Sequence, residues 1–332
     1  MKRHWPRQQP LLSLDTAQAT RLLRPLDRDI AVVEVTPLAS GLINTNLRVR
    51  LAGQADPLLL RLYRRGAAEA RKEAAIARLL QGRVPAARVL HVAGHNPVTG
   101  HAYAVFEWIE GECFDLVLPT LDDTALDRLG QAIGRVLAAI HGIYFDRYGF
   151  LADDLSLAEA IDVDGKGVLA FVRRCLSEGP ARARLGEALA VQLIVFMESE
   201  SAAVDGWLPP PCLVHGDFNP ANLLVRRDAS SGEWMLAAVL DWEFALAATP
   251  AFDFGNLLRP PLGQQGGFVQ ALAAGYRAAG GQLPDGWQRI ARLVDLTAWT
   301  EMLSRPNCAD AVIADARSII RATVADDLRE DI

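Results

Sequence analysis

The stretch that decides the fold runs from His215 to Val225 and reads HGDFNPANLLV, and the sequence LDWE follows at residues 240–243. Two apolar runs, 223–225 and 234–240, are separated by the turn-forming sequence DASSG. This pattern predicts a β-hairpin, because strands joined by a short polar turn pair in antiparallel fashion. Such a hairpin brings the residue before its first strand close to the residue after its second strand.

Two oxygen-bearing side chains stand at those two positions, Asn222 and Asp241. Mg²⁺ prefers oxygen ligands of this kind, keeps several waters and takes its remaining ligands from substrate phosphates. Asp217 lies on the loop that leads into this site, where it can face an incoming hydroxyl. The three residues together therefore predict a magnesium-dependent site for phosphoryl transfer.

The order His-Gly-Asp, four residues, Asn, a hairpin and Asp resembles the catalytic segment of the aminoglycoside phosphotransferase and choline kinase superfamily, which is related to protein kinases. The resemblance implies that Asp217 orients or deprotonates the acceptor hydroxyl, while Asn222 and Asp241 hold Mg²⁺ and ATP is the donor. A free Asp titrates near ~4, so it is a weak base at neutral pH. We expect Asp217 to act mainly by alignment, which dominates catalysis of phosphoryl transfer.

The resemblance also implies the fold class α+β: a protein-kinase-like fold with two lobes. A small N-terminal lobe with an antiparallel sheet would bind the nucleotide, and a larger, mainly helical C-terminal lobe would carry catalysis and acceptor binding. With 332 residues the chain exceeds the size at which a single core usually stops growing. Because the predicted sheet closes near residue 108 and the pattern then changes to helices, we place the two lobes at residues 1–108 and 109–332.

Side chains around the catalytic segment are expected to support it. His215 should be structural, with its ring hydrogen-bonded to the backbone, and Phe218 and Trp242 should pack beneath the loop. In the string ATPAFDFGNLL at 248–258, the resemblance implies that Asp253 braces the catalytic loop through hydrogen bonds. His141 is expected to be a packed histidine.

Composition limits the class of protein. Hydrophobic residues make up 51% and charged residues 22% of the chain, which is ordinary for a soluble globular protein. A net charge of −6 without a basic block argues against nucleic-acid binding and permits a cationic small-molecule acceptor. The four cysteines have no paired spacing, which fits a reducing cytoplasm, and no run of eighteen apolar residues predicts a membrane span.

Periodicity and turn signals predict the secondary structure. In the N-terminal lobe they predict a five-stranded sheet, with strands at 30–38, 45–51, 58–63, 89–92 and 102–108 and helices at 12–25 and 67–80. In the C-terminal lobe they predict helices at 122–141, 166–177, 181–204, 266–279, 286–304 and 309–328.

The first connection between strands, residues 39–46, lies where kinase-like folds place a loop over the phosphates. It contains one glycine, Gly41, and its backbone amides and the Ser40, Asn44 and Thr45 side chains are candidates to contact phosphate. A plain hairpin turn is the alternative for this segment. The motif GxxxxGK[ST] is absent from the sequence, which excludes a P-loop ATPase.

The third strand carries a candidate phosphate-binding cation. The string LLLRLYRRG at 58–66 resembles the choline kinase sequence, in which Arg replaces the lysine of protein kinases, and it assigns this role to Arg61. An Arg keeps the charge and adds a planar fork for phosphate oxygens. Its expected partner is Glu73, with Glu69 as the competitor, and Arg64 or Arg65 could take the place of Arg61.

Adenine is expected where the sheet passes into the helical lobe. Residues 104–111, AVFEWIEG, resemble the linker of the family, in which Phe106 flanks the pocket. The backbone carbonyl of Glu107 and the backbone amide of Ile109 would then pair with the base. An ordinary strand end before a turn at Gly111 is the alternative.

These expectations converge on an ATP- and Mg²⁺-dependent phosphotransferase acting on a hydroxyl of an aminoglycoside-, choline- or homoserine-like molecule. A catalytically inactive, kinase-like nucleotide-binding module is one alternative. A protein kinase is another, although no recognisable activation segment lies between Asp241 and Asp253. The acceptor and the oligomeric state stay open, because substrate choice is not fixed by a fold.

Overall fold

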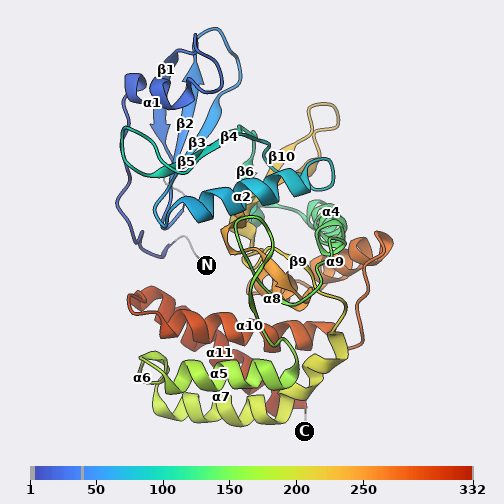
Figure 1. Cartoon of the computed structure of the whole chain (residues 1–332). Coiled ribbons are helices and arrows are strands. Elements are labelled where there is room, and N and C mark those ends of the chain that lie inside the picture. Colours follow the sequence, from blue (N-terminus) through green and yellow to red (C-terminus); the bar gives the residue numbers. More distant parts are fainter. Residues whose placement is uncertain (1–3, 39–40, 331–332) are drawn as a thin grey trace.

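The computed structural model describes residues 4–38 and 41–330, with side chains described up to residue 325. Figure 1 shows two lobes, an upper one built on a β-sheet and a lower one built mainly of helices. The predicted α+β architecture is therefore confirmed.

The sheet of the upper lobe has five strands in the order β1-β2-β3-β5-β4, and every neighbouring pair is antiparallel. The strands are β1 (Val32–Pro37), β2 (Thr45–Leu51), β3 (Leu58–Tyr63), β4 (Val89–Ala93) and β5 (Ala102–Glu107). All five correspond to predicted strands. β5 ends at Glu107, just before the boundary that the sequence analysis places after residue 108.

Two helices pack against opposite faces of this sheet. α1 (Thr16–Leu23) packs with Leu60 and Leu62 of β3, whereas α2 (Ala67–Leu80) packs with Leu59 and Tyr63. This alternation follows the two-residue period of a strand. It directs position 61, which lies between 60 and 62, toward the face covered by α2.

α1 is shorter than the predicted helix 12–25 because a capping box fixes its start. The Asp15 side chain accepts a hydrogen bond from the Gln18 amide at 2.7 Å, and the Gln18 side chain accepts one from the Asp15 amide at 2.9 Å. These bonds satisfy backbone donors that have no partner within the first helical turn.

Helices form most of the lower lobe. Its principal helices are α4 (Asp123–His141), α5 (Gly165–Ser177), α7 (Glu187–Glu200), α8 (Ala251–Leu257), α9 (Gly266–Ala278), α10 (Trp287–Ser304) and α11 (Asp310–Glu330). α4 lies against α9, and α10 packs against α8, α5 and α11. Their apolar faces build one large core around Leu137, Phe254 and Trp299.

The single helix predicted at 181–204 is wrong. The chain there forms α6 (Ala181–Leu185), then α7, then a 3₁₀ helix from Ser201 to Trp207. The break lies at Gly186, whose φ of 93° is incompatible with a continuous right-handed helix. Residue periodicity does not reveal such a break, because apolar residues continue on both sides of it.

Two small sheets of the lower lobe flank the catalytic segment. One contains β6 (Glu112–Cys113), β10 (Leu223–Arg227) and β11 (Trp234–Val239) in the order β11-β10-β6. The other contains β7 (Gly149–Leu151), β8 (Leu157–Ala160), β9 (Cys212–Val214) and β12 (Leu246–Ala248) in the order β8-β7-β12-β9. The sequence did not predict the second sheet, since its three- and four-residue strands are too short to show a period.

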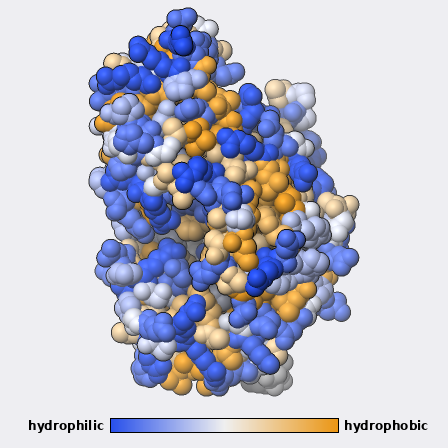
Figure 2. All heavy atoms as spheres, in the orientation of Figure 1, coloured by the Kyte–Doolittle hydropathy of each residue, from blue (hydrophilic) through white to orange (hydrophobic). Residues whose placement is uncertain are grey.

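Figure 2 shows hydrophilic residues over most of the upper and lower ends of this face, with hydrophobic atoms gathered mainly at mid-height. Within the described part of the chain, none of the helices has the length and hydropathy needed to span a membrane.

Candidate active site

The predicted hairpin is formed by β10 and β11, and it carries two of the predicted site residues at its open end. Leu223 pairs with Val239, and one step beyond them the Leu240 amide donates a hydrogen bond to the Asn222 carbonyl at 2.8 Å. Asn222 and Asp241 therefore stand on adjacent backbone segments. Asp241 adopts a left-handed conformation with φ of 66°, which turns the chain sharply at the end of the strand.

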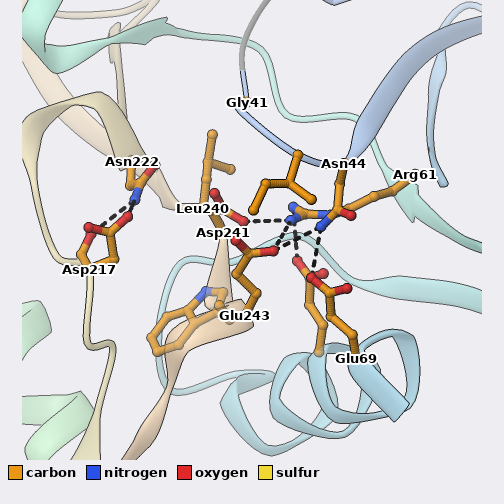
Figure 3. A network of polar contacts seen from close by, with 12 residues as sticks. Gly41, Asn44, Arg61, Glu69, Asp217, Asn222, Leu240, Asp241 and Glu243 are labelled. Atoms are coloured by element: carbon orange, nitrogen blue, oxygen red, sulfur yellow. Dashed lines mark hydrogen bonds and ion pairs between the residues drawn. The ribbon is translucent and has the colours of Figure 1, made fainter. Parts of the chain in front are cut away.

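Asp217 is held by two asparagines, of which Asn222 is labelled in Figure 3. Its Oδ1 accepts a hydrogen bond from the Asn219 side-chain amide at 3.1 Å, and its Oδ2 accepts one from the Asn222 amide at 3.0 Å. The Asp217 side chain is only 8% exposed. Both carboxylate oxygens thus have fixed positions, which suits a group that must align a reacting hydroxyl.

The orientation of the Asn222 amide follows from these contacts. Its nitrogen donates to both the carbonyl and the carboxylate of Asp217, at 2.9 and 3.0 Å. Since both partners are acceptors, the nitrogen rather than the oxygen must face them. The amide oxygen of Asn222 is consequently directed away from Asp217, where it can serve as a ligand.

His215 has the structural role that the sequence analysis expected. Its Nε2 lies 2.7 Å from the Leu240 carbonyl and therefore carries the proton, while its Nδ1 accepts from the Asp217 amide at 3.2 Å. The ring packs against Trp242 and Phe218, which are both buried. This histidine ties the catalytic loop to the end of the hairpin.

Asp253 braces the same loop from below. Its fully buried carboxylate accepts hydrogen bonds from the His215 amide at 2.8 Å and the Gly216 amide at 2.9 Å. A third contact, at 3.2 Å, comes from Nε2 of the buried His141, whose Nδ1 lies 3.0 Å from the Tyr276 hydroxyl. The predicted brace is present, and it extends to α4 and α9.

Arg61 lies at the centre of the cluster that faces Asp241 (Figure 3). The alternation of β3 directs it toward α2, where its Nη1 lies 3.2 Å from Glu73 Oε1. Its Nη2 lies 2.6 Å from Asp241 Oδ1 and 3.4 Å from Glu243 Oε2. The predicted Arg61–Glu73 ion pair is therefore present, and Arg61 rather than a neighbouring arginine occupies this buried position.

The charges of this cluster shift its pKa values. Burial acts to lower the pKa of Arg61, but Glu73 and Asp241 outweigh it and raise that pKa well above its usual value. Burial raises the pKa of Glu73, although Arg61 acts in the opposite direction. Burial, the Asp241 carboxylate and a hydrogen bond with Glu69 raise the pKa of Glu243 to about 9. These surroundings therefore favour the protonated form of Glu243.

Glu243 is the residue that sequence reasoning missed. It stands in the quoted LDWE segment, but its distance from the N-terminal lobe in sequence concealed its partners. Its Oε2 accepts a hydrogen bond from the Asn44 amide at 2.8 Å, and Asn44 also donates to Glu69 Oε1 at 2.9 Å. Asn44 therefore links the first loop to α2 and to the segment after Asp241.

The remaining predicted residues lie outside this network of contacts or outside the described residues. Ser40 falls outside the described residues. The next residue, Gly41, has a φ of 95°. Arg64 contacts His101 and Gln9 through its side chain. Glu107 pairs with Leu58 of β3, and its backbone amide donates a hydrogen bond to the Arg88 carbonyl at 3.0 Å. Ile109 lies in the connection between β5 and β6 and is half-buried.

The donor set around Asn222 and Asp241 fits a hard cation. It offers one amide oxygen and one carboxylate, and Mg²⁺ usually takes few protein ligands and completes its shell with water and phosphate. Among the side chains of residues 4–38 and 41–325, no group of three or more His, Cys, Asp or Glu is arranged to hold a metal. The arrangement thus suits a metal that arrives with a phosphate rather than a site built only of protein ligands.

Four acidic side chains of the helical lobe form ion pairs with arginines. These ion pairs are Arg71–Asp153, Arg173–Glu198, Arg289–Glu200 and Arg305–Glu301. The aromatic side chains of Trp287 and Trp299 are buried in the core of the same lobe, so they are parts of its packing.

Comparisons with known proteins identify the family and the fold of the chain. The sequence model of the phosphotransferase enzyme family, APH, matches residues 34–293. That range includes Arg61, Asp217, Asn222 and Asp241. A search of curated protein sequences found no match.

Solved structures with the same fold include aminoglycoside phosphotransferases. A thermostable mutant of APH(4)-Ia in complex with ADP and hygromycin B is 16% identical, with a TM-score of 0.66 over 94% of this chain and 98% of that one. An APH(2")-IIIa structure with GDP and kanamycin is 18% identical, with a TM-score of 0.71 over 94% and 99%. These likenesses establish the fold, and the family match covers well over half of the sequence. The chain therefore belongs to the phosphotransferase enzyme family.

Proposed function

We propose that this protein transfers the γ-phosphoryl group of ATP, bound with Mg²⁺, to a hydroxyl group of a small molecule. The observation that carries the proposal is the pair of fixed carboxylates on one loop-and-hairpin unit. Asp217 is immobilised by Asn219 and Asn222, and Asp241 stands on the backbone segment next to Asn222. In this arrangement one carboxylate, Asp217, would serve the acceptor, and the other, Asp241, would serve the phosphate donor.

Each residue then has a distinct task. Asp217 would accept a hydrogen bond from the acceptor hydroxyl and hold its oxygen in line with the phosphoryl group. Asn222, through its free amide oxygen, and Asp241 would hold Mg²⁺. When bound, the metal would neutralise charge on the phosphate oxygens, which is a large part of catalysis in this reaction class.

The nucleotide would lie between the sheet lobe and the hairpin. Arg61, oriented by Glu73, would contact phosphate oxygens, and the backbone around Gly41 and Asn44 would cover them. The backbone groups of Glu107 and Ile109 would pair with adenine. The four free cysteines and the need for ATP favour the reducing cytoplasm as the setting.

A transfer assay with radiolabelled ATP tests the proposal. The acceptors should include hygromycin B and kanamycin, which occur in complexes of structurally similar proteins, together with choline, homoserine and sugars. We expect label to move to one of these classes only when Mg²⁺ is present, and EDTA to abolish the transfer.

A parallel binding measurement separates the alternative. If Mg²⁺ and ATP raise the melting temperature while no acceptor becomes labelled, the chain is a nucleotide-binding module rather than an enzyme. If neither binding nor transfer occurs, the proposed nucleotide site is wrong.

A further inference from the structure

The N-terminal segment of the chain makes contacts that the proposed chemistry does not use. Residues 4–12, here called the N-terminal strap, leave the sheet lobe and run down toward the helical lobe (Figure 1). Besides the hydrogen bonds of Gln9 with Arg64 and of Leu12 with Thr45, the strap touches two separate parts of the protein. One is the loop of residues 41–44, and the other is the pair of helices α10 and α11.

At the loop, the strap binds four consecutive backbone carbonyls. The Arg7 guanidinium donates to the carbonyls of Gly41, Ile43 and Asn44, with the Ile43 contact at 3.2 Å. The Gln8 amide donates to the remaining one, the Leu42 carbonyl, at 2.8 Å. Burial and the positive charge of the nearby Arg64 lower the pKa of Arg7. The hydrogen bonds to the loop therefore hold the guanidinium in place despite repulsion from Arg64.

This pattern has a consequence for the other side of the loop. In a planar trans peptide the N–H of one residue points opposite to the C=O of the preceding residue. Carbonyls 41–44 face the strap, so the amides that follow them are directed away from it. Successive amides that point the same way form a concave anion site.

At the helical lobe, the strap is anchored by Trp5. The indole is only 8% exposed and belongs to the core of that lobe. Its Nε1 donates to Asp315 Oδ2 at 2.8 Å, and its ring meets Trp299 edge-on with centroids 6.4 Å apart. Leu42 of the loop packs against the same core.

We propose that the N-terminal strap sets the position of the 41–44 loop over the nucleotide phosphates, with Arg7 as the positioning residue and Trp5 as its anchor on the helical lobe. The inference rests on the proposed nucleotide role of the loop. The new element is that the position of the loop depends on residues that do not belong to the strands of the sheet lobe. It also couples the loop to α10 and α11.

Variants of the full-length protein test the proposal in two independent measurements. The first is hydrogen exchange of the peptide containing residues 41–47 without nucleotide. We expect faster exchange in Arg7→Ala and in Trp5→Ala, and wild-type exchange in Arg24→Ala, which removes an exposed arginine from the same lobe. Unchanged exchange in Arg7→Ala would overturn the proposal, and so would a Trp5→Ala effect confined to α10 and α11.

The second measurement is kinetic. Because each lost hydrogen bond is worth a factor of roughly 3 to 10, Arg7→Ala should raise KM for Mg²⁺·ATP about tenfold and leave KM for the acceptor unchanged. Arg7→Lys should recover part of the loss, since an ammonium can reach some of the carbonyls but lacks the guanidinium fork. Equal changes in both KM values would contradict the assignment.

The two measurements also keep this proposal separate from the proposed function. If wild-type protein binds no nucleotide, the function fails while hydrogen exchange still reports whether the strap holds the loop. If wild type is active and Arg7→Ala has wild-type exchange and kinetics, the function stands and the strap proposal fails.

Discussion

The Nη2 atom of Arg61 lies 2.6 Å from Oδ1 of Asp241, so the cation of the sheet lobe directly contacts the carboxylate at the end of the hairpin. Arg61 is 6% exposed and also meets Glu73 at 3.2 Å. In the proposed reaction both residues need other partners, a phosphate for Arg61 and Mg²⁺ for Asp241. The ion pair thus neutralises both groups when no nucleotide is bound, and we expect a Mg²⁺·nucleotide complex to separate them.

Removing the Arg61 side chain tests how much this cluster depends on it. In Arg61→Ala three carboxyl groups lose their buried cation, so we expect the free energy of unfolding to fall by about 3–5 kcal/mol. Urea denaturation measures it. Arg50→Ala is the matched control on the neighbouring strand, because Arg50 forms an exposed pair with Glu34 at 3.4 Å and should cost no more than about 1 kcal/mol. Equal losses in the two variants would show that the buried cluster has no special energetic role.

The raised pKa of Glu243 predicts a pH-dependent stability difference. The folded protein favours the protonated form up to about pH 9, whereas the unfolded chain loses that proton near ~4. Stability contributed by this group is therefore present at low pH and declines as the pH rises from about 5 to 9. Glu243→Gln keeps an oxygen for Asn44 and a donor for Glu69, and it cannot ionise.

We expect the melting temperature of Glu243→Gln, relative to wild type, to increase steadily between pH 5 and pH 9. Differential scanning calorimetry at several pH values measures this trend. Glu112→Gln controls for the loss of an exposed negative charge. A difference that stays flat with pH would mean that Glu243 is ionised in the folded protein across this range.

Local sequence patterns predicted the site residues that share a segment, and the family resemblance predicted the Arg61–Glu73 pair, but neither predicted the contact between Asn44 and Glu243. The hairpin follows from two apolar runs and a turn, and its register then places Asn222 beside Leu240. The Asn44–Glu243 hydrogen bond joins residues 199 positions apart, and no local pattern encodes it. The break at Gly186 was missed because apolar residues continue on both sides of it, and the Trp5 anchor was missed because its partners on α10 and α11 are distant in sequence.

Substitution of Asp217 tests the acceptor side of the site. Asp217→Asn keeps the size of the side chain but removes the charge and one acceptor oxygen, so transfer should fall by roughly 10²–10⁴-fold. Nucleotide affinity should stay within a factor of about three, because the proposed metal ligands are unchanged. Asp228→Asn, in the exposed turn of the hairpin, provides a control with the same chemical change. Loss of nucleotide binding in Asp217→Asn would place this residue on the donor side instead.

Two glycines have similar positive φ angles, but only one of them lies in the catalytic loop. Comparing substitutions at the two positions separates the steric effect of a Cβ in that loop from the backbone strain. Gly216 has φ of 74° and Gly232, in the hairpin turn, has φ of 71°. A Cβ added at 216 would lie 2.5 Å from the Phe244 carbonyl oxygen, whereas one added at 232 meets nothing within 4 Å.

Both alanine variants should lose about 1–2 kcal/mol from the left-handed conformation alone. Gly216→Ala should lose more, because the clash pushes the loop away from Phe244 and disturbs the 2.9 Å bond from the Gly216 amide to Asp253. Since Asp217 is the next residue, we also expect kcat to fall at least tenfold in Gly216→Ala, and to remain at the wild-type value in Gly232→Ala. Chemical denaturation and the transfer assay measure the two effects. Wild-type kcat in a folded Gly216→Ala protein would mean that the brace on the loop does not control the position of Asp217.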